Sequence, residues 1–80
     1  MSIANVEEVV KERFAGIMNI PSETVDLDAN LASEYGVDSL KALKLISQVE
    51  VEFDVDIEEQ EAQEIRKLND VIDLIKGKLA

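Results

Sequence analysis

The sequence predicts an all-α fold, a small four-helix bundle with a long first loop and a short third helix. Apolar residues recur at spacings of three and four in three separate stretches, as they do along one face of a helix. Eighty residues leave room for a single core, so residues 1–80 are expected to form one domain. The one alternating stretch, Val55 and Ile57 between two aspartates, has nothing nearby to pair with, and we expect a connector there.

The first helix is expected over residues 3–18, where the helical spacing joins Ile3, Val6, Val10, Phe14 and Ile17. Pro21 marks the point beyond which this helix cannot continue. Residues 19–38 have no sustained period and contain many turn formers, which predicts a long loop. Three apolar residues in it are expected to pin the loop to the core: Val25, Leu27 and Leu31.

A second helix is expected from Ser39 to about Phe53, with Asp38 as its N-cap. Its predicted buried stripe consists of Leu40, Leu43, Ile46, Val49 and Phe53. A short third helix is expected around Glu59–Glu64. The last helix is expected to begin after Asn69, which would cap it, and to bury Val71, Ile72, Ile75 and Leu79.

The composition excludes several classes of function. Eighteen acidic residues against eight basic ones give a net charge of −10, which argues against binding nucleic acid or anionic membranes and favours partners with basic patches. The chain has no cysteine and no histidine, which rules out thiolate chemistry and a Ser–His–Asp triad. No apolar run approaches the ~20 residues of a membrane helix. We therefore expect a cytoplasmic protein with no metal site that is not an enzyme by itself.

The most informative stretch is Gly36-Val37-Asp38-Ser39-Leu40. Gly36 allows a sharp turn, and Asp38 caps the helix in whose first turn Ser39 lies. Leu40 is expected to point into the core, which would leave the Ser39 hydroxyl facing solvent at the positive end of the helix. The plainer interpretation of an isolated Asp-Ser-Leu tripeptide is ordinary helix capping.

This stretch resembles the prosthetic-group attachment site of acyl carrier proteins, and the likeness covers nearly the whole chain. The matching residues outside the motif are Leu31, Glu34-Tyr35-Gly36, Glu50-Val51-Glu52-Phe53-Asp54, Ile57, Glu61-Ala62, Ile65, Asp70, Ile72 and Ile75. The resemblance implies that a phosphopantetheinyl transferase moves phosphopantetheine from coenzyme A onto Ser39, with Asp38 read by the transferase as well as capping the helix. The thiol of the arm would then carry acyl groups as thioesters between separate enzymes.

The resemblance also implies a pocket that shelters the acyl chain. The matching positions are Ile46, Val49, Phe53, Ala62, Ile65 and Leu74, which could equally be simple core residues. The chain departs from the family pattern at Lys41 and Lys44, where many members are acidic. These lysines are either solvated surface residues or determinants of partner choice. Glu50 and Glu52 keep the far end of the helix acidic, and with them the recognition of basic docking patches.

Several interpretations therefore stay open. The first is a monomeric acyl carrier protein serving enzymes of fatty-acid, polyketide or related acyl metabolism. The second is a carrier for another cargo, such as an activated amino acid. The third is a helical interaction module that is never modified, in which the motif at Ser39 would be accidental.

Overall fold

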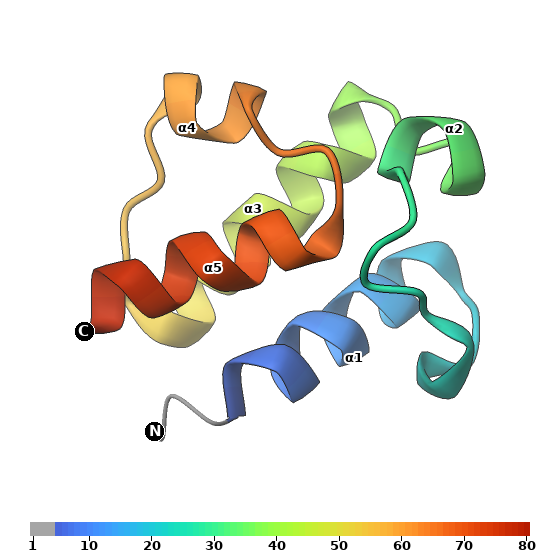
Figure 1. Cartoon of the computed structure of the whole chain (residues 1–80), viewed down its shortest axis with the longest axis horizontal. Helices are drawn as coiled ribbons and strands as arrows, with labels where there is room; N and C mark the ends of the chain where they lie inside the picture. The colour runs from blue at the N-terminus through green and yellow to red at the C-terminus, as the bar shows by residue number, and fades with distance from the viewer. Residues whose placement is uncertain (1–4) are drawn as a thin grey trace.

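The computed structural model describes residues 5–80, and over this range it contains helices and no strand. The elements are α1 (Val6–Met18), η2 (a 3-10 turn, Ser22–Thr24), α2 (Leu31–Tyr35), α3 (Ser39–Phe53), α4 (Glu59–Gln63) and α5 (Leu68–Leu79) (Figure 1). The all-α class and the three long helices with a short one before the last are confirmed. Residues 3 and 4, where the first helix was expected to begin, lie outside the described range.

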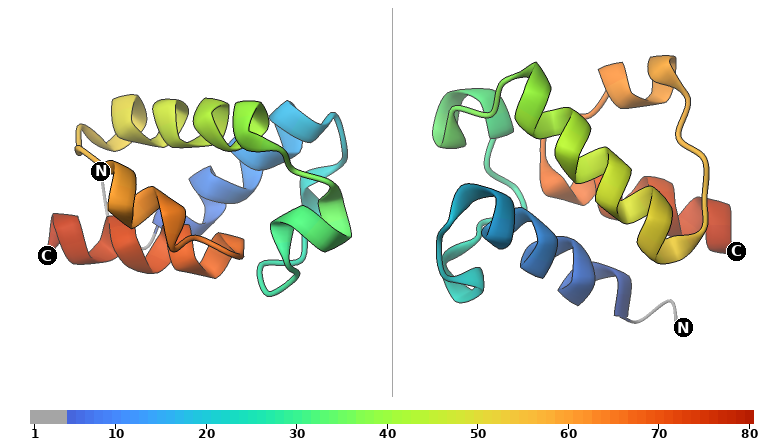
Figure 2. Two further views of the ribbon diagram at one scale, coloured as in Figure 1. Left: turned by 90° about the horizontal axis from the view of Figure 1, so that it is seen from above. Right: turned by 180° about the vertical axis from the view of Figure 1, so that it is seen from behind.

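The core lies between the three long helices. Helix α1 packs against both α3 and α5. Seen from above, α3 and α5 run along opposite sides of the molecule and α1 crosses obliquely beneath them (Figure 2). The fully buried side chains come from all three: Phe14, Leu68, Ile75, Val6, Val10, Val49 and Val71.

The predicted buried stripe of α3 is wrong at its beginning. Leu40 and Leu43 are 63% and 60% exposed, whereas Leu45, Val49 and Phe53 are buried. At 3.6 residues per turn, the nine residues from Leu40 to Val49 make about 2.5 turns, so the two side chains point to opposite sides of the helix. The sequence spacing could not decide which apolar side faces α1, because α3 has apolar residues on nearly every side.

The predicted loop at 19–38 contains an additional helix, α2. Asn30 caps it, because its Oδ1 accepts a hydrogen bond from the Ser33 amide at 2.9 Å. Gly36 ends it in the left-handed conformation at φ 64°, which glycine adopts without steric cost. A helix of five residues with one buried side chain, Leu31, shows no periodicity along the sequence.

The long first loop is pinned to the core as expected. Val25 and Leu31 are buried, and the Leu31 amide donates to the Arg66 carbonyl at 2.9 Å. Tyr35 packs edge-on against Phe14 at a centroid distance of 5.0 Å, and its hydroxyl oxygen accepts a hydrogen bond from the Asp26 amide. These contacts of Leu31 and Tyr35 hold both ends of α2. They thereby fix the position of residues 36–39, which lead from α2 into α3.

Helix α5 begins one residue before the predicted cap, Asn69. The carboxylate of Asp70 accepts hydrogen bonds from the amides of Arg66 and Lys67, at 2.8 and 3.2 Å. It thereby satisfies backbone amides at the start of the helix. Asn69 instead lies inside the first turn, where its side-chain amide donates to Asp28 in the long loop. Asn69 therefore ties the loop to α5 rather than capping the helix.

Candidate functional site

Ser39 is the first residue of α3 and is exposed to solvent. The predicted cap is confirmed, because Asp38 Oδ1 accepts a hydrogen bond from the Lys41 amide at 2.9 Å. The amides of the first turn without a helical partner, together with the dipole, make this end of α3 electropositive. The exposure of Ser39 agrees with the sequence prediction, but not through the predicted burial of Leu40, which is itself exposed.

A cavity of about 380 Å³ opens beside Ser39 and extends between the helices to Phe14 of α1 and Val71 of α5. Its size lies within the range of small-molecule sites. Asp38, Ser39, Lys41, Asn30 and Arg66 supply its polar residues. The remaining lining is apolar: Phe14, Ile17, Leu31, Ala32, Val37, Ala42, Leu45, Ile46, Ala62, Ile65 and Val71.

The cavity contains half of the predicted pocket residues. Ile46, Ala62 and Ile65 line it. Val49 and Phe53 are buried in the core and do not line it. Leu74 lies in a separate shallow depression between α4 and α5, among four carboxylates. Of the pocket positions implied by the resemblance, Val49, Phe53 and Leu74 therefore lie outside the lining of this cavity.

Sequence reasoning missed several lining residues, and the helical spacing that joins Ser39 to the predicted Ile46 could have found Ala42 as well. Ala42 and Ile46 follow Ser39 at spacings of three and seven, which places them on the same side of the helix as the serine. Leu31 and Val37 of the long loop carried no such signal. They reach the cavity only because the loop folds back against α5.

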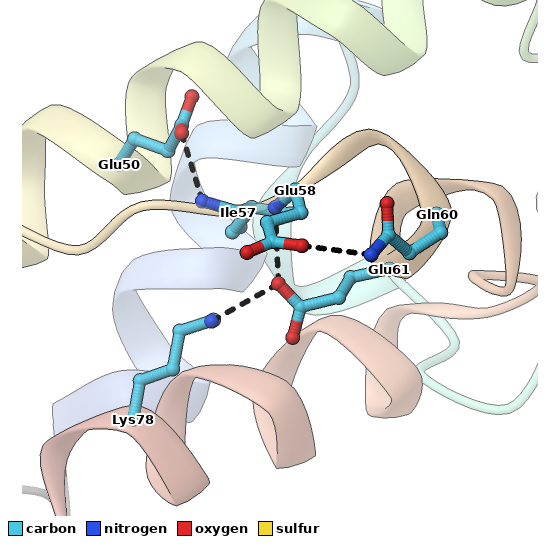
Figure 3. A network of polar contacts seen from close by, with 6 residues as sticks. All are labelled: Glu50, Ile57, Glu58, Gln60, Glu61 and Lys78. Atoms are coloured by element: carbon cyan, nitrogen blue, oxygen red, sulfur yellow. Dashed lines mark hydrogen bonds and ion pairs between the residues drawn. The ribbon is translucent and has the colours of Figure 1, made fainter.

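Helix α4, which carries Ala62 in the cavity wall, is held by a polar network (Figure 3). Glu61 Oε1 accepts hydrogen bonds from the Glu58 amide and from Lys78 Nζ of α5, each at 3.0 Å. The Glu58 amide, and second the Lys78 ammonium, hold the pKa of Glu61 below its ordinary value. At the other side, Glu50 of α3 accepts from the Ile57 amide at 3.0 Å. The network therefore fixes the cavity wall to both neighbouring helices.

The four predicted partner-recognition residues differ in their surroundings. Glu52 pairs with Arg13 of α1 at 2.9 Å, and Glu50 is engaged by Ile57, so both carboxylates already have partners inside the molecule. Lys41 is half-buried at the cavity and Lys44 is exposed. Within residues 5–80, neither lysine lies within ion-pair distance of a carboxylate.

The arrangement presents a hydroxyl to solvent beside an apolar cavity. Ser39 has no histidine to act as its base, because the chain contains none. In the part of the chain that the structure describes, no cluster of acidic residues could hold a metal ion. No helix over residues 5–80 is long and apolar enough to cross a membrane. An exposed hydroxyl beside an apolar cavity suits a tethered group whose chemistry is supplied from outside.

Comparison with known proteins agrees with this geometry. The phosphopantetheine attachment-site family model matches residues 8–75. The acyl carrier protein of Nitratidesulfovibrio vulgaris (strain DP4) is 36% identical over 74 residues, covering 92% of this chain and 97% of its own. That of Thermosynechococcus vestitus is 34% identical over 80 residues, covering 100% and 99%.

Solved structures give the same answer for the fold. A Mycobacterium tuberculosis structure described as a candidate acyl carrier protein superposes with a TM-score of 0.75 and 32% identity, covering 82% of this chain and 88% of that one. The acyl carrier protein of Enterococcus faecalis superposes with a TM-score of 0.81, covering 98% and 99%, and its 20% identity makes it a likeness of fold alone.

Proposed function

Because this chain belongs to the acyl carrier protein family, whose members carry a phosphopantetheine group and are carriers rather than enzymes, we propose that Ser39 holds that group here. The observation that carries the assignment is the exposed Ser39 at the capped start of α3, beside a cavity of about 380 Å³. Asp38 supports the assignment in two ways. Its side chain caps the helix, and the residue directly precedes the serine whose hydroxyl a transferase must recognise.

The proposed attachment is a phosphoryl-group transfer from coenzyme A. The Ser39 oxygen forms a new bond to the phosphorus that bears pantetheine, the bond from that phosphorus to the nucleotide half breaks, and the serine proton leaves to a base of the phosphopantetheinyl transferase. The electropositive start of α3 favours the resulting phosphodiester. The arm supplies a thiol, which the chain lacks because it contains no cysteine.

The proposed cargo is an acyl group held as a thioester on that thiol. An apolar acyl chain on the arm can fold back into the cavity, where Ile46, Ala62 and Ile65 would contact it. A cargo of charged or strongly polar groups would bury unpaired polarity there. This preference supports an acyl chain over an activated amino acid.

The proposed partners are a phosphopantetheinyl transferase and separate acyl-loading and acyl-processing enzymes of fatty-acid, polyketide or related acyl metabolism. The proposal includes a monomeric carrier acting in the cytoplasm. Basic patches on such enzymes could contact the exposed carboxylates between α3 and α5, which are Asp54, Asp56, Glu58, Glu59 and Glu64.

Mass spectrometry tests the attachment. The purified chain is incubated with coenzyme A, magnesium and a broad-specificity phosphopantetheinyl transferase, and one phosphopantetheine should be added per chain. Ser39→Ala should add none, and Ser33→Ala, which changes an exposed serine of α2, should react like the wild type. An unmodified wild-type chain, under conditions that modify another carrier, would contradict the proposal and favour an interaction module.

A further inference from the structure

The outward side of α3 is unusually apolar. Within residues 5–80, the exposed large apolar side chains are Leu40 at 63%, Leu43 at 60% and Val51 at 83%, and all three belong to this helix. Their spacings of three and eight residues place them on one side. We call this side, made of Leu40, Leu43, Lys44, Ser47 and Val51, the outer face of α3. It begins one residue after Ser39, so whatever covers it lies next to the proposed arm.

The charge of this region is opposite to that of the molecule. Residues 39–49 contain Lys41 and Lys44 and no carboxylate, in a chain whose net charge is −10. Neither lysine is paired with a carboxylate over the described residues. Lys41 lies at the cavity beside Ser39, and Lys44 borders a shallow depression that it shares with Glu12, Arg13 and Gln48. The α3 side of the proposed arm is therefore apolar and locally basic, and the carboxylate adjoining Ser39 is that of Asp38, which caps the helix.

We propose that the outer face of α3 docks on acyl-processing enzymes whose active-site entrance is apolar and rimmed by carboxylates. This inference rests on the proposed function, and it specifies the partner's charge next to Ser39. Carboxylates opposite Lys41 and Lys44 would accelerate encounter, whereas a basic rim there would place like charges together and be rejected. Basic patches further out can still contact the acidic residues after α3.

Two other occupants fit the same face less well. A symmetric dimer of this chain through α3 would bring the same patch of each copy together and oppose lysines to lysines. An anionic membrane would attract the two lysines but repel the remainder of a chain with a net charge of −10. Charge complementarity therefore favours an acidic enzyme surface.

The test uses two forms of one condensing enzyme, a parent whose entrance is rimmed by basic residues and a variant in which those residues are glutamate. Each is assayed with the loaded wild-type chain and with the loaded Lys41→Glu/Lys44→Glu chain. The rate of acylation by a small acyl-pantetheine thioester, which needs no docking, is measured for each enzyme. The rates with the loaded chains are then divided by that rate. At low ionic strength, the wild-type chain should have a kcat/KM about fivefold or more higher with the glutamate-rimmed enzyme, and the double variant should prefer the parent.

A matched control separates local from total charge. Lys11→Glu/Lys76→Glu changes the net charge equally, on α1 and α5, and should keep the wild-type preference. Leu43→Gln should lower kcat/KM about fivefold with the glutamate-rimmed enzyme without changing the unfolding midpoint, because Leu43 is already 60% exposed. An undiminished rate for Leu43→Gln would overturn the apolar part of the proposal.

Mass spectrometry measures the loaded fraction of the chain before each assay. A chain that fails to load therefore contradicts the proposed function and not the docking proposal. A fully loaded wild-type chain that prefers the basic-rimmed parent as strongly as the double variant does would overturn the docking proposal alone. Two further results would overturn the docking proposal in favour of the other occupants. One is a dimer in light scattering that Leu43→Gln abolishes. The other is sedimentation of the wild-type chain with phosphatidylglycerol vesicles that the double variant loses.

Discussion

The cavity beside Ser39 predicts that the stability of the loaded carrier depends on the length of its acyl chain. Hexanoyl extends acetyl by four carbons, and burying each contributes about 0.8 kcal/mol, or about 3 kcal/mol if all four enter the cavity. A domain of this size gains about 4–8 °C in its unfolding midpoint per kcal/mol. The hexanoyl form should therefore melt about 12–24 °C above the acetyl form when the four carbons are fully buried.

Calorimetry or circular dichroism on the two loaded forms measures this difference. Ala62→Phe places a ring in the cavity wall and should reduce the difference between the hexanoyl and acetyl forms. Ala29→Phe is a matched control, because Ala29 is half-buried and does not line the cavity. Comparing two loaded forms of the same variant cancels any change in its own stability. Equal midpoints for the hexanoyl and acetyl forms of the wild type would refute burial of the chain.

Three further changes test the framework of the site. Asp38→Ala removes the cap of α3 and should lower the free energy of unfolding by about 1 kcal/mol in urea titrations, whereas Asp38→Asn should retain most of it. Phe14→Ala deletes a side chain that is 1% exposed and should cost about 3–5 kcal/mol by the same assay. The pKa of Glu61 lies below its ordinary value of 4.5 in the folded state, so its contacts with Glu58 and Lys78 stabilise the fold above that pH. This stabilisation is lost as the pH falls through the lower folded pKa, and the melting difference between wild type and Glu61→Gln should shrink below pH 4.5 and stay constant above it.

These tests bear on features that the sequence and the structure reveal to different degrees. The helices at Ser39–Phe53 and Glu59–Gln63 and the cap at Asp38 could be predicted, because each depends on neighbours within a few residues. The first loop was predicted as a connection pinned by apolar residues, and Val25 and Leu31 confirm this. Helix α2 inside that loop was missed, because a single turn with one buried residue has no period to detect.

The candidate site divides in the same way. The proposed attachment residue, Ser39, followed from a local motif and from the family likeness, and its exposure agrees with the prediction. The cavity followed only in part, because its walls come from residues far apart in the chain, such as Phe14, Leu31 and Val71. Spacing along one helix can select Ile46 but cannot reveal which loop folds against it.

The sequence by itself determined the approximate positions of the three long helices and of α4, the capped serine at the start of α3 and the absence of any cysteine or histidine to perform chemistry. Only the tertiary structure decided which side of α3 is buried. Because that helix is apolar on nearly every side, its orientation depends on where α1 and α5 pack, and their packing leaves Leu40 and Leu43 outside while Leu45 and Val49 are enclosed.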